Sequence, residues 1–503
     1  MRKRCVLAAM AALIGGTSTA SAQWREVETA HFRIVSESQP AKIEEFAARL
    51  ESYDKLMRMA TGIAEGESVK VRIYEVASTG EIERALGLDG SGVAGFYDNN
   101  ALGPYAVTPR KTKDSGRYFT PALVLHHEYA HHFMLQYFPA IYPSWYTEGF
   151  AELIASSQPL DDGRIGYGMP AKHRGNEIAA YWVPLSELLT KEKVTNLDRY
   201  GQGWALTHFL TFDKTRAGRL RSYLTALANG QSYAEASKVF GDLSALNREA
   251  RRYVTSGTFE YKPVKVDVTR PVIVRSRLLS QGEAALIGET IAFRDDELSL
   301  YRKAGARKRE EGLRRSNLDR IRVKAAHYSN DPYALQLLAE SEFAMGEFAR
   351  SETAADRLLS MNPNHVRGLA RKSLLLSTSA SKLSGQARAA KAKQARQMAA
   401  KANRLDNDDP MPLLAFYQSF NLAGEKPSPV AIEGLIQVVS RLPRDNGTRQ
   451  LLVDQMVRDK RFDEAIAWLR PIANSPHESP RRDAAREQLK QLEVAKTGKM
   501  AAR

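Results

Sequence analysis

Cysteine is almost absent from this chain of 503 residues, which contains only Cys5. Cys5 precedes the apolar part of an N-terminal segment that we expect to be removed, whereas a lipid-anchored cysteine would have to follow that part. The mature chain would then contain no cysteine at all. Disulfide bonds, a thiol nucleophile and a zinc site with cysteine ligands are therefore excluded from it.

Long apolar runs are also scarce. The N-terminal run at 6–14 is too short to cross a bilayer as a helix. It follows three cations at 2–4 and precedes the small residues 20–22, which is the pattern of a secretory signal peptide. We therefore predict that residues 1–22 are removed and that the mature chain is exported, to the periplasm or outside the cell. It is not expected to span a membrane, and an uncleaved anchor is the alternative.

Acidic residues are fewer than basic ones, and the formal net charge is +15. Removing residues 1–22 would leave +12, because that segment holds three cations and no acidic residue. The cations are densest in 302–324 and 366–404, but no nucleic-acid motif interleaves them with aromatic residues. We therefore expect solvated helix faces and no nucleic-acid partner. Weak attraction to an anionic membrane or cell-wall polymer stays open.

What the sequence does contain is an H-E-x-x-H motif at 127–131. His127 and His131 are four residues apart, so on a helix they project from the same face and can hold one Zn²⁺. The surrounding residues are apolar, which is typical of a buried helix, and we predict one over 119–138. His126 and His132 fall on other faces of that helix, where we expect packing or surface roles rather than metal ligation.

A second motif follows at 145–152, with two carboxylates four residues apart. Catalytic zinc takes three protein ligands and keeps one position open, and Glu148 fits as the third ligand. Prolines 139 and 143 would end the first helix, so that a second helix can cross it. Glu152 lies on the same helical face as Glu148. We predict that it accepts a hydrogen bond from a ligand imidazole and fixes its tautomer.

The pattern H-E-x-x-H followed by P-x-W-x-x-E-G-x-A-E resembles the gluzincin metallopeptidases, and more narrowly the peptidase-MA-like group of bacterial proteins. The segments 24–32, 200–206 and 223–227 are similar to the opening strand and later helices of that group. The resemblance covers about residues 23–260. It implies an α+β zincin-like fold, with Zn²⁺ held by the three ligands His127, His131 and Glu148. It also implies Glu128 as the general base toward the water that zinc activates.

Two further parts of such a site are predicted with alternatives left open. A tyrosine hydroxyl facing the metal could stabilise the oxyanion of the reaction, and Tyr200 is our candidate. Tyr181, His173 and His208 compete with it, and Tyr200 could instead be a core aromatic. The segment 92–98 is proposed to align an extended substrate by backbone hydrogen bonds, with an ordinary sheet edge as the alternative.

The remaining chain divides by its patterns. We assign 23–256 to the zincin-like metallopeptidase domain and 257–328 to a linker with short strands and a helix. A unit of tetratricopeptide length occupies 331–364, a partial match occupies 456–476, and a long helix is expected at 386–404. We therefore predict an all-α domain of tetratricopeptide-like helical repeats over 329–495, followed by a disordered tail at 496–503. The repeats would bind a protein partner or merely cap the first domain.

These observations favour an exported zinc-dependent peptidase that hydrolyses peptide bonds of a peptide or protein substrate, with one Zn²⁺ per chain and Glu128 as general base. The first alternative is a catalytically silent peptidase-like scaffold that binds envelope proteins through its helical repeats. The second is a zinc site that serves only stability. The intact Glu128 favours the enzyme, because neither alternative needs a base.

Overall fold

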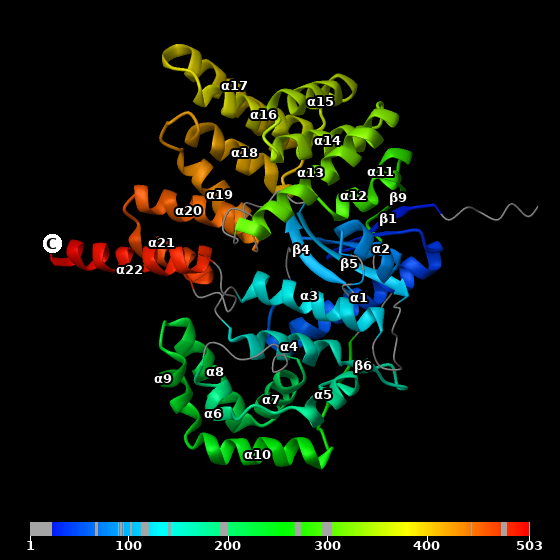
Figure 1. Cartoon of the computed structure of the whole chain (residues 1–503), viewed down its shortest axis with the longest axis vertical. Helices are drawn as coiled ribbons and strands as arrows, with labels where there is room; N and C mark the ends of the chain where they lie inside the picture. Colours follow the sequence, from blue (N-terminus) through cyan, green and yellow to red (C-terminus); the bar gives the residue numbers. More distant parts are fainter. Residues whose placement is uncertain are drawn as a thin grey trace, which may run out of the picture.

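The structure is a computed structural model, shown in Figure 1. A mixed sheet lies at the centre of the molecule, a row of paired helices lies above it in this view, and the helical segments between residues 121 and 256 lie below it. The predicted signal peptide, residues 1–22, lies outside the described residues. The structure describes residues 23–65, 69–88, 90, 93, 95–100, 103–111, 120–138, 142–191, 200–266, 273–293, 304–443, 445–473 and 480–501.

The central sheet has six strands, with β4 at one edge and β9 at the other. Strands β2, β3 and β5 are parallel neighbours, while β4, β1 and β9 pair antiparallel at the two sides. The first strands of the chain are two short ones, because a tight turn reverses the chain at Thr29, whose N–H donates to the carbonyl of Phe32. In spatial order the strands are β4 (Phe96–Asn100), β5 (Gly103–Lys111), β3 (Val71–Ser78), β2 (Phe32–Ser36), β1 (Arg25–Glu28) and β9 (Arg275–Leu278).

Alternating apolar residues give this sheet two buried faces. Ile34 and Ile73 belong to the larger core, which also includes residues of α1 (Pro40–Thr61) and α3 (Pro121–Tyr137). Their neighbours Val35, Tyr74 and Val107 belong to a smaller core on the opposite face. Because side chains alternate across a strand, both faces must be covered. The second face is covered by the helices α2 (Thr79–Leu86) and α12 (Ile287–Ile291).

Below the sheet, short helices surround α4. The chain between 175 and 188 forms two separate helices, because Pro184 precedes a new helix and the Gln202 side chain bonds both backbone groups of Val183. A small second sheet joins β6 (Gln158–Pro159), β7 (Ile165–Tyr167) and β8 (Lys262–Val264). The helices are α4 (Ser144–Ala155), α5 (Gly175–Ala180), α6 (Leu185–Leu188), α7 (Gly201–Thr211), α8 (Lys214–Ala228), α9 (Tyr233–Ser237) and α10 (Leu243–Ser256).

Helices α4 and α7 approach each other closely at two glycines. A Cβ atom at Gly149 would lie against the carbonyl oxygen of Gly203 and the hydroxyl of Thr207, well inside van der Waals contact. A Cβ atom at Gly203 would likewise meet the carbonyl oxygen of Trp145. Because Gly149 directly follows Glu148, this contact also sets the position of the predicted third ligand.

We expect the substitution Gly149→Ala to lower the free energy of unfolding by about 1–3 kcal/mol, because two backbones would have to move apart. Urea unfolding followed by circular dichroism would measure the change. Gly218→Ala is the matched control: it lies inside α8 with open space around it, so alanine should stabilise by about 0.8–1 kcal/mol. Equal stability of the Gly149→Ala variant and the wild type would show that the helices are not in close contact there.

The segment expected as a linker, 257–328, is instead part of both folded units. Strand β9 pairs with β1, and its Arg277 donates to the carboxylates of Glu26 and Glu283. Helices α11 (Gln281–Ala285) and α12 then lie between the sheet and the first repeat, where Thr290 shares a hydrogen bond with Tyr333. The sequence pattern suggested a connector because β9 is short and its partner strand lies about 250 residues earlier.

The C-terminal half is a row of antiparallel helix pairs, which makes it a tetratricopeptide-like helical domain. The unit predicted at 331–364 is the pair α14 and α15, and the long helix predicted at 386–404 is α17. The predicted tail differs, because the last helix continues to Ala501. The helices are α13 (Ala304–His327), α14 (Pro332–Ala344), α15 (Phe348–Met361), α16 (Val366–Ser381), α17 (Gly385–Leu405), α18 (Pro410–Asn421), α19 (Pro429–Arg441), α20 (Asn446–Arg458), α21 (Phe462–Ala473) and α22 (Pro480–Ala501).

The row of helices curves back toward the first domain. The side-chain amide of Gln136, near the end of α3, donates to the carbonyl of Ser440 in α19 at 3.2 Å. Figure 1 shows α19–α22 toward the left of the molecule, with α21 and α22 nearest to the level of α3. Over the described part of the chain, no helix combines the length and apolar character that crossing a membrane requires.

Candidate metal centre

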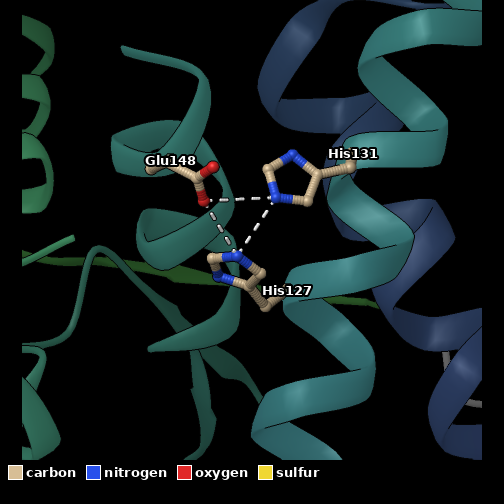
Figure 2. Close-up of side chains that lie close together, drawn as sticks. All are labelled: His127, His131 and Glu148. Atoms are coloured by element: carbon tan, nitrogen blue, oxygen red, sulfur yellow. Dashed lines mark hydrogen bonds and ion pairs between the residues drawn. The ribbon is translucent and has the colours of Figure 1, made fainter. Parts of the chain in front are cut away.

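Two helices bring the predicted ligands together. Helix α3 begins at Pro121, and the hydroxyl of Thr120 caps it by accepting from the N–H of Leu123. Helix α4 begins directly after Pro143 and packs beside α3. Figure 2 shows His127 and His131 projecting from α3 toward Glu148 on α4, so that all three side chains point at one another.

The distances between these side chains fit one zinc ion. The Nε2 atoms of His127 and His131 are 3.1 Å apart, and Oε2 of Glu148 lies 3.2 Å from the first and 3.4 Å from the second. Tetrahedral zinc with bonds of about 2.0–2.1 Å holds its ligand atoms about 3.3 Å apart. Oε2 of Glu148 is buried and has no hydrogen-bond partner of ordinary geometry among the described residues. These atoms therefore fit zinc, and leave a fourth position for a substrate or water.

The electrostatics of the centre favour a cation. Burial alone would lower the pKa of His127, but the carboxylates of Glu148 and Glu152 outweigh it and raise the pKa to about 10. Burial alone would raise the pKa of Glu148, but the two imidazoles outweigh it and hold this pKa well below its usual range. Without a metal, the site therefore takes up a proton on an imidazole to balance its carboxylates, and a metal cation can replace that proton.

Glu152 lies behind His127, where its predicted role requires it. Its Oε1 is 3.4 Å from Nδ1 of His127, on the side of the ring opposite to the ligand nitrogen. The carboxylate is fully buried and accepts from Nε2 of His173 at 2.6 Å and from Arg174 at 2.7 Å. An Nδ1–H bonded to Glu152 would leave Nε2 of His127 free to bind the metal.

Glu128 is held at the edge of the sheet, one residue from a ligand. Its Oε2 accepts from the backbone N–H of Tyr97 in β4 at 3.1 Å. The hydroxyl of Tyr97 in turn bonds Nδ1 of His132 at 2.7 Å, so that α3 fixes this edge strand twice. The predicted aligning segment 92–98 thus corresponds to β4 from Phe96 onward, while residues 92 and 94 lie outside the described residues.

The other histidines of α3 have packing contacts, as their positions on the helix predicted. His126 is buried and stacks on Tyr53 with ring centroids 3.4 Å apart, and burial lowers its pKa to about 3. His132 is buried between Tyr97 and Tyr129, and burial lowers its pKa to about 3 as well. Both rings are therefore neutral at pH 7 and serve to fix α3 against its neighbours.

We expect Tyr97→Phe to lower the free energy of unfolding by about 1–3 kcal/mol, because it leaves Nδ1 of the buried His132 without this partner. Differential scanning calorimetry of the variant and the wild type would measure the loss. Tyr261→Phe is the control. Because Tyr261 is 45% exposed, removing its hydroxyl should change the free energy of unfolding little. A loss below about 0.5 kcal/mol for Tyr97→Phe would contradict the assigned bond.

Tyr200 lies beside the centre, directly before α7. Its ring centroid is 5.9 Å from that of His127, and the guanidinium of Arg174 lies 4.4 Å from the centroid of the Tyr200 ring. The competing residues are placed differently. His208 is bonded to Tyr253 and to the carbonyl of Gly168, away from the ligands, and His173 is bonded to Glu152.

Sequence reasoning missed Arg174 and Tyr97, and did not foresee the bond between His173 and Glu152. Arg174, Tyr97 and His173 belong to no spaced motif. Each is brought to the centre by a turn or strand that lies 21 residues or more from its partner in the sequence.

Comparison with known proteins finds solved structures of low sequence identity and low TM-score. No protein-family model and no curated protein matches this chain. Among solved structures, a thermophilic TPR protein of Thermus thermophilus is 19% identical over 38% of this chain and 95% of its own, with a TM-score of 0.31. Yeast Tom70 is 10% identical over 73% of this chain and 69% of its own, with a TM-score of 0.26.

Proposed function

We propose that this protein is a zinc-dependent peptidase of the gluzincin kind, with one Zn²⁺ held by His127, His131 and Glu148. The observation that carries the proposal is the triangle of ligand atoms, with sides of 3.1, 3.2 and 3.4 Å, directly beside Glu128. We further propose that residues 1–22 direct its export to the periplasm or the cell exterior. A zincin-like fold for residues 23–256 is part of the same proposal, supported by the metal helix packed on a mixed sheet.

Zinc in this position supplies a Lewis acid that makes water nucleophilic and polarises a carbonyl group. Glu128 would take the proton of the attacking water and pass it to the departing amine. The N–H of Tyr97 keeps the Glu128 carboxylate in place before the reaction. The hydroxyl of Tyr200 is proposed to donate a hydrogen bond to the oxygen on which negative charge develops.

The edge strand β4 offers a way to hold a peptide in the correct orientation. Among the described residues it pairs with β5 and is the last strand on that side of the sheet. An extended peptide can add to such an edge through backbone hydrogen bonds, which give affinity without dependence on sequence. Because Glu128 bonds to Tyr97 of this strand, a peptide bound there would pass beside the general base.

The proposal is tested by incubating the purified chain 23–503 with a peptide library, once loaded with zinc and once stripped of metal. We expect discrete cleavage products only with the zinc-loaded protein, and mass spectrometry would map the cleaved bonds. A zinc-loaded chain that leaves the library intact would count against general peptidase activity and favour the second candidate below.

The second candidate is a catalytically silent scaffold that binds envelope proteins. It is favoured by the row of helix pairs from α14 to α22, because stacked helical repeats form extended surfaces that bind peptides and proteins. Library peptides retained on the immobilised chain without being cut would support it. Peptide cleavage that disappears with the metal would exclude it as the complete account.

A further inference from the structure

Behind the metal ligands lies a cluster that connects the metal centre to Tyr200, formed by Glu152, His173, Arg174 and Glu177. Arg174 precedes α5, and its Nε and Nη2 both donate to Oε1 of Glu152, at 3.1 and 2.7 Å. This is the oxygen that faces Nδ1 of His127. Arg174 therefore fixes the carboxylate that orients a metal ligand, without contacting the ligand itself.

The same guanidinium also reaches the residue proposed to stabilise the oxyanion. Its central carbon lies 4.4 Å from the centroid of the Tyr200 ring, the range of a cation–π contact. Its Nη1 lies 3.5 Å from the carboxylate of Glu177, which accepts from the N–H of Gly201 at 2.9 Å. Arg174 and Glu177 thus hold the start of α7 from two sides, and Tyr200 stands directly before that helix.

The charges explain why an arginine is needed. Glu152 is fully buried beside the imidazole rings of His127 and His173. An imidazole is charged only when it is protonated, so these rings are not permanent cations. Among the described residues, Arg174 supplies the permanent cation that this buried carboxylate bonds. A buried carboxylate without a cation is costly, so loss of Arg174 would be relieved by movement of Glu152 away from His127. A planar guanidinium can bond a carboxylate at its edge while an aromatic ring lies on its face, which an ammonium cannot do.

We propose that Arg174 is a positioning residue that holds Glu152 behind the metal ligand His127 and Tyr200 beside it at the same time. This inference rests on the proposed function, but it makes a separate statement about metal affinity. It predicts that the two effects of Arg174 can be divided by the choice of substitution. Arg174→Met removes both contacts, whereas Arg174→Lys keeps a cation for Glu152 but not the flat surface against Tyr200.

The test measures zinc affinity by competition with a chromophoric chelator for the wild type, Arg174→Met and Arg174→Lys. We expect Arg174→Met to bind zinc about 10–100-fold more weakly, the size of effect seen when an outer hydrogen bond to a ligand is lost. Arg174→Lys should bind zinc within about 3-fold of the wild type, since its ammonium still neutralises Glu152. Arg164→Met is the matched control, because Arg164 is 45% exposed and pairs only locally with Asp162.

Two further readouts separate the two contacts of Arg174. Visible absorption of the cobalt-loaded proteins, which reports on the metal ligands, should be altered in Arg174→Met and close to the wild type in Arg174→Lys. Peptide cleavage by Arg174→Lys should show a lowered kcat with KM unchanged, since Tyr200 acts on the transition state. Wild-type zinc affinity in Arg174→Met would overturn the assignment while leaving the proposed function intact. A wild-type protein that binds no zinc would overturn the proposed function itself.

Discussion

Replacing Glu128 with glutamine is expected to lower the rate of peptide cleavage by about 10²–10⁴-fold, the usual contribution of a general base. An amide cannot accept the proton of the attacking water, but its oxygen can still accept from the N–H of Tyr97, as Oε2 of Glu128 does. The fold and the metal ligands should therefore be retained. Initial cleavage rates and zinc content per chain, measured on the same preparation, would check both parts.

Glu187→Gln provides the control for this variant, because Glu187 is a half-exposed carboxylate that pairs with Lys191, four residues later in the chain. It should cleave at the wild-type rate. Unchanged cleavage in Glu128→Gln would show that another group removes the proton. Loss of zinc together with activity would show that Glu128 acts on the metal site rather than on the reaction.

The second large effect is expected on stability. Zinc that binds only the folded chain should stabilise it by about 4 kcal/mol when the free zinc concentration is about 1,000 times Kd. In His131→Ala one of the three ligands is missing, so the same zinc concentration should produce little stabilisation. Thermal unfolding of each protein with and without zinc would measure the difference. His127 and Glu148 alone do not complete the three-ligand set that such a site needs.

His327→Ala is the matched control, because His327 is exposed on α13 and lies outside the metal centre. Its stabilisation by zinc should equal that of the wild type. If His131→Ala were stabilised as strongly as the wild type, zinc would be bound elsewhere. If neither protein were stabilised, the three side chains would have no metal-binding role under these conditions.

The candidate metal centre could largely be predicted from the sequence, because its residues lie close together in the chain. The four-residue spacing of His127 and His131 on one helix fixes their common direction. The second motif lies close behind, and prolines mark where the chain must turn. Glu148 and Glu152 then follow from the same helical spacing. The structure brings all four of these residues together.

Arg174 and the edge strand could not be derived in the same way, because their contacts depend on folding over long distances. Arg174 reaches Glu152 from a turn 22 residues away, and Tyr97 reaches Glu128 from a strand 31 residues away. The same reason explains why the segment 257–328 was expected to be a linker. Strand β9 becomes part of the sheet by pairing with β1, which lies about 250 residues earlier in the sequence. By contrast, the helix pair at 331–364 repeats a local pattern and was predicted close to its observed bounds.

The measurement that tests the central claim most directly is a crystal structure of the zinc-loaded chain 23–503, with diffraction data collected on both sides of the zinc absorption edge. We predict a single anomalous peak between Nε2 of His127, Nε2 of His131 and Oε2 of Glu148, at about 2.0–2.2 Å from each. No peak at this position, or a peak bound by other residues, would contradict the proposed zinc centre and the peptidase function that depends on it.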